Sequence, residues 1–431
     1  MQLQGAHTLF QLQIHVASMA AYIVGAALSP IGRKLHRPAL SLMNEAVVGA
    51  LADASARSAA PLPKIGALLT FPSLSQPLVM PGHRVAETLG DSIERSALCR
   101  AVDCGGASPV VALRQAVALV RGGEANLACV VGADAVGSLS QRELLRRVAA
   151  GAGEDPSADG AALLRVPGLY DRYARLHAER HGTTRSQLAA VAAYARLMAS
   201  RHPAAVATGD ATVDAVLATP PVADATTVAE CAVRCDGGGA LIVASEALAA
   251  TFAGRIPVLG TGEASMAPDD PPATLDEVVD SVRRAAYAAR AEAGVERRWR
   301  TADIVGWAGV YDCFPVSFLA ALEGTGLVDD GRAAAAYAAA RLGSGGGRRG
   351  PAPPALPAIN THGGLLGFGA PWEAPALFSA VEAVAQLRGE AGPRQVPWDA
   401  VDWPTPARAL VHANGGIFFH QAVAFLGAAE G

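Results

Sequence analysis

The stretch Asn360-Thr361-His362-Gly363-Gly364-Leu365-Leu366 places a glycine pair directly before apolar residues. An amphipathic helical pattern follows it and ends at Gln386-Leu387-Arg388, with Gly389 directly behind. An earlier part of the chain repeats this design, because Gly105-Gly106 precede a helical pattern that ends at Arg121-Gly122-Gly123. Glycine just past the last helical residue suits a left-handed cap. Two such segments in one chain predict duplicated α/β halves.

Apolar strands flank these helical segments in both parts of the chain. Tyr22-Ile23-Val24-Gly25-Ala26 and Ile256-Pro257-Val258-Leu259-Gly260 each run into small residues. Ala128-Cys129-Val130-Val131-Gly132 and Ala409-Leu410-Val411-His412 follow the helices. These runs are continuously apolar rather than alternating, which is typical of strands buried on both faces of an α/β sheet.

The composition changes between the two halves. Residues 146–205 carry Arg, His, Tyr and Ala at helical spacing, which predicts a helical insertion. Near the N-terminus apolar and polar side chains alternate from Phe10 to Val16, a strand-like period, and no basic region precedes them, so we do not interpret this segment as a secretory signal. Residues 342–357, rich in Gly and Pro, predict a surface loop. We expect four parts: an N-terminal extension (1–19), a first half (20–145 plus 206–250), the helical insertion (146–205) and a second half (251–431).

The composition excludes several classes of protein. With 431 residues and 51% hydrophobic residues, the chain can bury a large core. Its net charge of -4 gives no electrostatic reason to bind nucleic acid or an anionic membrane. No run reaches the roughly 18 uncharged apolar residues of a spanning helix. The six cysteines lack the spacing of a zinc site or a disulfide framework, so we expect reduced thiols in a cytoplasmic protein.

Further segments identify a family resemblance. Val310-Tyr311-Asp312-Cys313-Phe314 and Cys235-Asp236-Gly237-Gly238-Gly239-Ala240, with the stretch from Asn360 to Glu390, resemble the thiolase superfamily in the right order. The resemblance extends from about residue 20 to the C-terminus and implies a five-layer αβαβα fold. Within the superfamily, Gly105-Gly106-Ala107-Ser108-Pro109 and Ala413-Asn414-Gly415-Gly416 are similar to the lipid-transfer-protein or sterol-carrier branch.

The residues of normal thiolase chemistry are missing. That chemistry uses a cysteine thiolate at a helix N-terminus, where the helix dipole lowers its pKa, together with an activating histidine and a second cysteine. The resemblance places Gly106, Ala370 and Ala413 at these three positions. We therefore expect no acyl-cysteine intermediate, and we interpret Cys104 as a buried, unreactive thiol.

Four polar residues are candidates for catalysis by resemblance: Tyr311, Asp312, Asn360 and His362. In one branch that lacks the cysteine, the steroid side-chain retro-aldolases, tyrosines are the acid–base groups, and Tyr311 falls where one is expected. The second should lie near Ala370, so the match is partial. A phenol with a pKa of about 10 needs help to act as a base. The alternatives are a packing role for Tyr311 and a turn-pinning role for His362.

The candidate substrate-binding residues surround the same segments. They are Gly106, Ser108, Cys313, Trp372, Asn414 and Gly415. We expect Trp372 to shape the acyl tunnel and Cys313 to be structural. His177 and His181 have the spacing of two metal ligands on one helix face. With no third ligand evident in the sequence, we expect a solvated helix face and no metal.

Two classes of function remain open. The first is an enzyme, a C–C lyase of the aldolase type or an acyltransferase, acting on β-hydroxy- or β-ketoacyl-CoA in lipid or steroid degradation. The second is a catalytically silent subunit that binds acyl-CoA or supports an active partner. The resemblance implies acyl-CoA as substrate, no separate cofactor, a homodimer formed through an edge strand of the first half, and a companion protein of zinc-ribbon and OB-fold type. From the charge and composition we expect no nucleic acid and no membrane as partners.

Overall fold

Twelve strands are present in the computed structural model, which describes residues 20–151, 153, 161–207, 209–266, 272–342, 356–398 and 407–431. Five strands of the large sheet come from the first half: β1 (Ala21–Leu28), β2 (Ile65–Thr70), β3 (Ile93–Ala101), β4 (Leu127–Ala135) and β7 (Asp236–Ser245). Five come from the second half: β8 (Ile256–Ser265), β9 (Trp307–Gly309), β10 (Ala358–Ile359), β11 (Ala407–Gly415) and β12 (His420–Gly427). A separate small pair is formed by β5 (Pro221–Ala223) and β6 (Thr226–Thr227).

The two halves have the same topology. The sheet order is β10-β9-β11-β12-β8-β1-β7-β4-β2-β3. From each outer edge inward, the first three strands are parallel to one another and the last two pairings are antiparallel. The halves join where Tyr22 pairs with Pro257 and Ile23 pairs with Ile256. This internal repetition confirms the predicted duplication, and all four expected strands are present.

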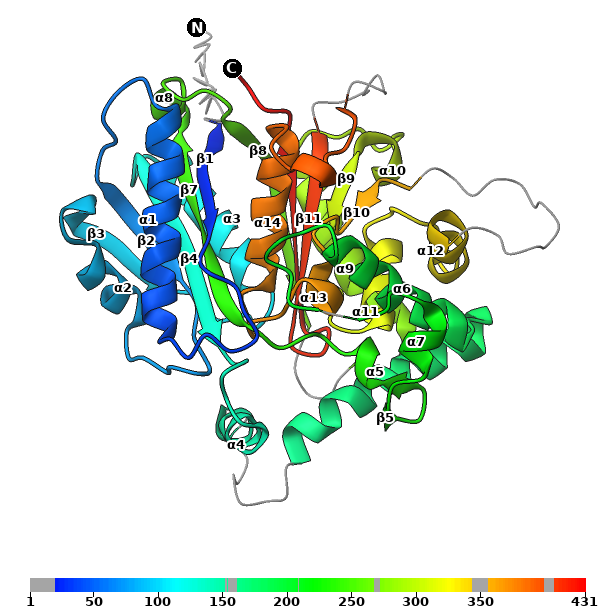
Figure 1. Ribbon diagram of the computed structural model, residues 1–431. Coiled ribbons are helices and arrows are strands. Elements are labelled where there is room, and N and C mark those ends of the chain that lie inside the picture. The colour runs from blue at the N-terminus through cyan, green and yellow to red at the C-terminus, as the bar shows by residue number, and fades with distance from the viewer. Residues whose placement is uncertain are drawn as a thin grey trace, which may run out of the picture.

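The main helices form three layers with strands between them (Figure 1). On the outer face of the first half lie α1 (Ala39–Arg57) and α2 (Pro81–Leu89), and on that of the second half lie α9 (Leu275–Glu292) and α11 (Pro315–Gly324). The central layer is α3 (Ser108–Arg121) and α14 (Pro375–Leu387), which contact strands of both halves. Apolar side chains from both helices and both sets of strands make one core there. The arrangement is αβαβα, as expected.

The ends of the central helices explain one correct prediction and one error. Gly123 after α3 has φ 74° and Gly389 after α14 has φ 76°, so both helices end at left-handed glycines as predicted. Gly363-Gly364, however, do not begin α14. They begin the separate short helix α13 (Gly364–Gly367), because the Asp312 carboxylate accepts the Leu365 N–H at 2.7 Å and starts a helix there. The turn equivalent to Gly105-Gly106 is instead the segment directly before Pro375.

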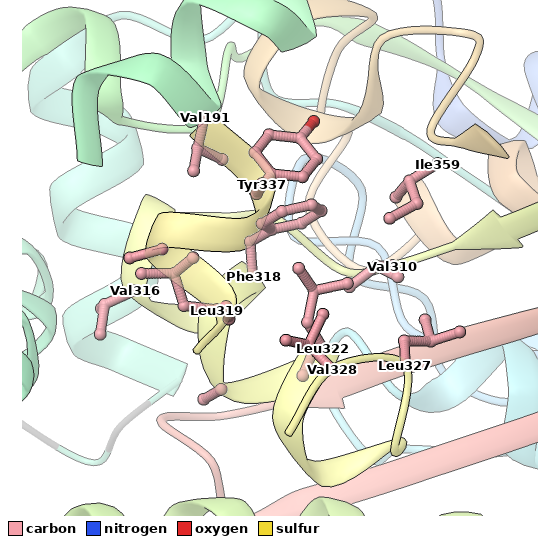
Figure 2. Packing of buried hydrophobic residues seen from close by; sticks show 14 of the residues in the cluster. Val191, Val310, Val316, Phe318, Leu319, Leu322, Leu327, Val328, Tyr337 and Ile359 are labelled. Atoms are coloured by element: carbon pink, nitrogen blue, oxygen red, sulfur yellow. The ribbon is translucent and has the colours of Figure 1, made fainter. Parts of the chain in front are cut away.

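Helices fill the chain between β4 and β7. They are α4 (Gln141–Gly151), α5 (Ala161–His181), α6 (Arg185–Ala199) and α7 (Val213–Leu217), so helical structure begins before residue 146. Val191 of α6, Phe318 of α11 and Tyr337 of α12 (Ala333–Leu342) share one apolar cluster, which attaches this region to the second half (Figure 2). The expected solvated face is wrong for His177 of α5, whose side chain is buried.

Short helical segments complete the described chain. They are α8 (Glu246–Ala249), α10 (Thr301–Ile304) and three 3-10 turns, Gly90–Ser92, Val228–Glu230 and Gly392–Arg394. The predicted N-terminal extension (1–19) and most of the predicted loop at 342–357 lie outside the described residues. Within the described part of the chain, no helix is long and apolar enough to cross a membrane.

Candidate active site

The candidate site lies at the N-terminus of α3, where the turn from β3 brings Gly105 and Gly106 against the end of β11. Gly105 has φ 57°, a conformation that glycine adopts without strain. A Cβ atom on Gly106 would overlap the Tyr311 hydroxyl oxygen and the Asn414 carbonyl oxygen. The phenol of Tyr311 thus fills the space beside the position where the resemblance places a nucleophilic cysteine. Gly106 and Tyr311 depend on each other sterically.

The loop after β9 positions Tyr311, and Asn360 holds this loop. Asn360 Oδ1 accepts the Val310 N–H at 2.8 Å, and Asn360 Nδ2 donates to the Val310 carbonyl at 2.8 Å. Asn360 has φ 47°, a left-handed conformation that asparagine tolerates better than most residues. Both ends of its amide are therefore used on the backbone. The geometry gives Asn360 a positioning role rather than that of a free donor to a substrate.

Tyr311 is a buried and protonated phenol. Its side chain is only 8% exposed. Burial raises the pKa of Tyr311 well above its ordinary value, and the charges of Cys313, Glu373 and Asp312 raise it further. At neutral pH the hydroxyl keeps its proton, so Tyr311 is equipped to donate a proton or a hydrogen bond rather than to act as the first base.

Asp312 stabilises the loop that carries Tyr311 by accepting a backbone hydrogen bond from Leu365. Burial raises the pKa of Asp312 to about 7, while backbone hydrogen bonds from Leu365 and Leu366 oppose this shift. The carboxylate lies so close to Gly364 that a Cβ atom there would overlap it. Asp312 thus caps α13 and fixes the direction of the loop that carries Tyr311.

His362 lies in a different polar environment from Tyr311. Burial lowers the pKa of His362 to about 4, and the nearby charged groups are Glu382, His202 and Arg394. Its Nδ1 atom is buried without a hydrogen-bond partner among the described residues. The structure therefore does not bring His362 into the set around Tyr311 and Gly106.

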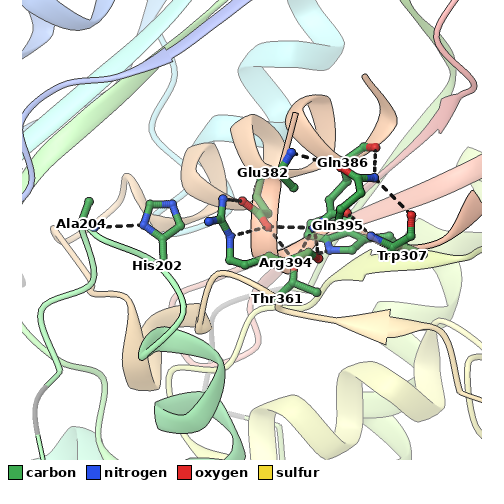
Figure 3. A network of polar contacts seen from close by, with 10 residues as sticks. His202, Ala204, Trp307, Thr361, Glu382, Gln386, Arg394 and Gln395 are labelled. Atoms are coloured by element: carbon green, nitrogen blue, oxygen red, sulfur yellow. Dashed lines mark hydrogen bonds and ion pairs between the residues drawn. The ribbon is translucent and has the colours of Figure 1, made fainter. Parts of the chain in front are cut away.

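The neighbouring Thr361 anchors this segment to the core through a buried network (Figure 3). Its hydroxyl accepts from Trp307 Nε1 at 2.8 Å and donates to Glu382 Oε1 at 2.7 Å. Arg394 binds both carboxylate oxygens of Glu382, at 3.1 and 2.9 Å, and Gln386 donates to Glu382 at 3.0 Å. The network joins β9 to α14 and so holds the chain next to Asn360 in place.

Glu373 belongs to the site and was missed in the sequence. Ser108 Oγ accepts the Cys104 N–H at 2.8 Å and donates to Glu373 Oε2 at 3.0 Å, so the predicted residue Ser108 orients this carboxyl group. Burial raises the pKa of Glu373 to about 8, and Asp103 raises it further. Its charge also acts on Tyr311 and Cys104. An acidic residue two places before Pro375 resembles an ordinary helix-start residue, which hides its role in the sequence.

The strand β11 presents His412, not Ala413, to Tyr311. Successive side chains of a strand point to opposite faces, and Ala413 packs into the central core with Val411. His412 Nδ1 accepts the Tyr311 N–H at 3.4 Å, and His412 Nε2 lies 3.0 Å from Gln421 Oε1. Burial lowers the pKa of His412 to about 4, so the ring is neutral. The sequence signal that could have identified His412 is the presence of a histidine at the end of an apolar strand.

The helical region contributes a second tyrosine. Tyr170 of α5 donates to the Gly416 carbonyl and accepts from Asn414 Nδ2, both at 3.2 Å. Its ring stacks on Phe314, with centroids 4.4 Å apart. Tyr170 also hydrogen-bonds with Cys313, and burial raises the pKa of the Cys313 thiol to about 11.

The remaining predicted residues border the site. Gly415 packs against the Cys104 carbonyl, so the turn at Gly105-Gly106 and the turn at Gly415-Gly416 are in direct contact. Trp372 has φ 52° and a partly exposed side chain beside Glu373. Burial raises the pKa of Cys104 to about 11, with further contributions from Glu263, Asp103 and Glu373. Neither Cys104 nor Cys313 is therefore a thiolate at neutral pH.

Comparison of the sequence with known proteins shows similarity to thiolases and sterol carrier proteins. Residues 273–428 match the family described as thiolase C-terminal domain-like. Acetyl-CoA acetyltransferase of Methanothermobacter thermautotrophicus is 30% identical over 235 residues, which are 53% of this chain and 57% of that protein. Human sterol carrier protein 2 is 26% identical over 54% of this chain and 41% of that protein. The chain thus spans about half the length of the curated relatives it matches.

Solved structures show the same fold over nearly the whole chain. The Ltp2-ChsH2(DUF35) aldolase has a TM-score of 0.72 at 23% identity and covers 95% of this chain and 98% of its own. A monomeric SCP2-thiolase-like protein of Mycobacterium smegmatis has a TM-score of 0.64 at 18% identity, over 94% of this chain and 77% of its own. These findings confirm the resemblance to the thiolase superfamily in sequence for residues 273–428, and they show the same fold over nearly the whole chain.

Proposed function

We propose that this chain is a retro-aldol enzyme that cleaves a C–C bond in β-hydroxyacyl-CoA thioesters. The observation that carries the proposal is the phenol of Tyr311 at Gly106, where a thiolase would hold its nucleophile. A protonated phenol forms no acyl-enzyme, but it can donate to negative charge that develops on a substrate. The likeness to sterol carrier proteins and to an aldolase supports a lipid-related thioester as the substrate class.

In the proposed reaction, the Glu373 carboxylate takes the proton of the β-hydroxyl group. The β-carbon becomes a carbonyl carbon, the Cα–Cβ bond breaks, and its electron pair forms the enolate of the thioester. Tyr311 then protonates Cα, and the proton held by Glu373 returns to the phenolate. The products are a ketone or aldehyde and a shortened acyl-CoA, so atoms and electrons balance. The N-termini of α3 and α14 both lie at this site, and their dipoles favour the enolate.

The test is cleavage of a panel of β-hydroxyacyl-CoA thioesters, followed by mass spectrometry of both products. Tyr311→Phe removes only the phenolic oxygen, and general acid–base catalysis typically contributes roughly 10²–10⁴-fold. We expect turnover to fall at least tenfold without loss of folding. Tyr287→Phe is the matched control, because Tyr287 is 57% exposed. Wild-type rates in Tyr311→Phe would remove Tyr311 from the mechanism.

A companion protein is part of the proposal. The aldolase of similar fold carries two component names, Ltp2 and ChsH2, which supports testing this chain with the expected zinc-ribbon and OB-fold partner. Each assay is therefore run with and without the companion. If neither arrangement cleaves any thioester, the result favours the alternative, in which this chain is a silent subunit. Binding of acyl-CoA measured by calorimetry then shows whether it still holds the ligand.

A further inference from the structure

A histidine pair and a glutamate meet at the end of α5 that is remote from Tyr170. His177 and His181 are one turn apart on α5, and Glu323 comes from the last turn of α11. Their nearest ligand atoms all lie within 4.8 Å of one another. The third ligand that the sequence did not reveal is thus supplied by a helix about 140 residues further along the chain.

The His177 ring is arranged as metal-binding imidazoles are. Its Nδ1 atom lies 2.6 Å from the Thr183 hydroxyl oxygen, a contact that fixes the ring orientation. Its Nε2 atom is buried without a hydrogen-bond partner among the described residues, and it points at Glu323 Oε1 at a distance of 3.5 Å. At that distance the pair makes no more than a weak hydrogen bond or ion pair. The distance agrees with the separation of about 3.4 Å between two ligands of a tetrahedral zinc ion.

The other two groups are also held in place. Glu323 Oε1 accepts the Ala333 N–H at 3.2 Å, and the side chain is almost fully buried. The His181 ring packs over Gly331 so closely that a Cβ atom there would overlap it. The two imidazole rings lie 4.9 Å apart, and His181 is partly exposed. A water molecule would supply the fourth ligand of a tetrahedral ion.

We propose that His177, His181 and Glu323 form a binding site for one Zn²⁺ ion or a similar divalent transition metal. Two imidazoles and one carboxylate favour zinc, cobalt or nickel over magnesium or calcium, which prefer oxygen ligands alone. The proposal does not depend on the reaction proposed for Tyr311.

The site fastens α5 to α11. Tyr170 stacks on Phe314 at the start of α11, and Tyr170 and His177 are seven residues, or about 10 Å, apart along the α5 axis. The two helices therefore touch at two points, one in the candidate active site and one at the metal ligands. A bound ion stabilises the folded chain and holds Tyr170 in register with the loop of Tyr311.

The experiment uses the full chain stripped with EDTA and then titrated with ZnCl₂ or CoCl₂ alone. We expect one equivalent of metal by plasma mass spectrometry, a visible Co²⁺ spectrum of tetrahedral type, and a Tm increase of about 3 °C or more with saturating Zn²⁺. Glu323→Gln and His181→Ala should each weaken binding at least tenfold. His83→Ala is the control that should bind normally, because His83 is exposed on α2.

Two outcomes would overturn the proposal. One is less than a tenth of an equivalent bound to the wild type, with no change in Tm. The other is unchanged binding in His181→Ala, which would place the metal elsewhere. If Glu323→Gln fails to fold by circular dichroism, His181→Ala decides alone, since His181 is partly exposed and its loss leaves the core packed.

Discussion

At the scale of single residues, the phenol of Tyr311 fills the space beside Gly106, where the resemblance places a nucleophilic cysteine. Any side chain on Gly106 would meet the Tyr311 hydroxyl and the Asn414 carbonyl. Restoring the cysteine is therefore not a local change, because the space it needs is already filled. This contact is the reason we propose a reaction without an acyl-cysteine on a thiolase-like fold.

The steric dependence can be measured with a double-mutant cycle. Gly106→Cys should lower the free energy of unfolding by about 1–3 kcal/mol, the usual cost of overpacking a buried site. Tyr311→Ala should relieve the part of that strain that comes from the phenol, while the overlap with the Asn414 carbonyl stays, so the double variant should be more stable than the sum of the two single effects. Additive effects in urea unfolding would contradict the contact.

Intact-mass analysis after incubation with acetyl-CoA should show no added acetyl group on the wild type.

The base assigned to Glu373 predicts a pH–rate profile. The pKa of Glu373 is raised to about 8, and only its ionised form can accept the hydroxyl proton. Wild-type kcat/KM should rise with pH and level off above about 8. Glu373→Gln should lower kcat/KM at least tenfold and remove the rise, while Glu87→Gln, an exposed carboxylate on α2, should leave the profile unchanged. A rise that persists in Glu373→Gln would assign it to another group.

Stability gives an independent check of the same carboxyl group. Its pKa is raised from 4.5 to about 8 on folding, so the folded state keeps a proton that the unfolded chain has lost. Wild-type stability therefore falls as the pH rises through this window. Glu373→Gln lacks this loss, so its Tm relative to wild type should be higher at pH 9 than at pH 5.

The sequence supplies Tyr311 as a candidate, but it does not supply Glu373, and for His412 it offers only a histidine in an apolar strand. The Tyr311 segment carries a recognisable motif. Glu373 acquires its role from Ser108, 265 positions away, and His412 acquires its role from Tyr311, 101 positions away. Such pairings depend on tertiary structure, so a single sequence without that structure does not reveal them.

At the scale of elements, period and glycine position predicted most of the architecture. The apolar runs became β1, β4, β8 and β11 because each is buried in the sheet. The assignment of Gly363-Gly364 to α14 failed because a side chain outside the segment, Asp312, starts a separate helix there. Local pattern cannot show a cap that comes from another part of the chain.

The α13 turn yields a prediction with a matched control. Gly364 has φ 60° and a Cβ atom there would overlap the Asp312 carboxylate, whereas Gly123 has φ 74° and open space around it. Both alanine variants should lose about 1 kcal/mol for the left-handed conformation. Gly364→Ala should lose at least about 1 kcal/mol more, from the displaced carboxylate and its broken cap. Equal losses for the two variants in urea unfolding would contradict the capping role of Asp312.

At the scale of the whole molecule, the duplicated sheet ends in two unequal edges. The outer strand of the second half, β10, has two residues, while β3 of the first half has nine. A long free edge invites pairing with another strand unless it is covered. The edges could be predicted only once the strand order was known, since sequence pattern gives strands but not their neighbours.

We therefore expect a homodimer in which β3 of one protomer pairs with β3 of its partner. Light scattering after gel filtration should give about twice the chain mass of 43.8 kDa. Cys99 and Arg100 are adjacent in β3 and pair with Leu68 and Leu69, so their N–H groups point to opposite sides of the strand. Cys99→Pro and Arg100→Pro are therefore compared. The variant at the residue whose N–H faces outward should dissociate the dimer and leave a folded monomer. Proline at the other removes a bond to β2 and should lower the Tm instead. A monomeric mass for the wild type at micromolar concentration would show that the β3 edge stays unpaired in solution.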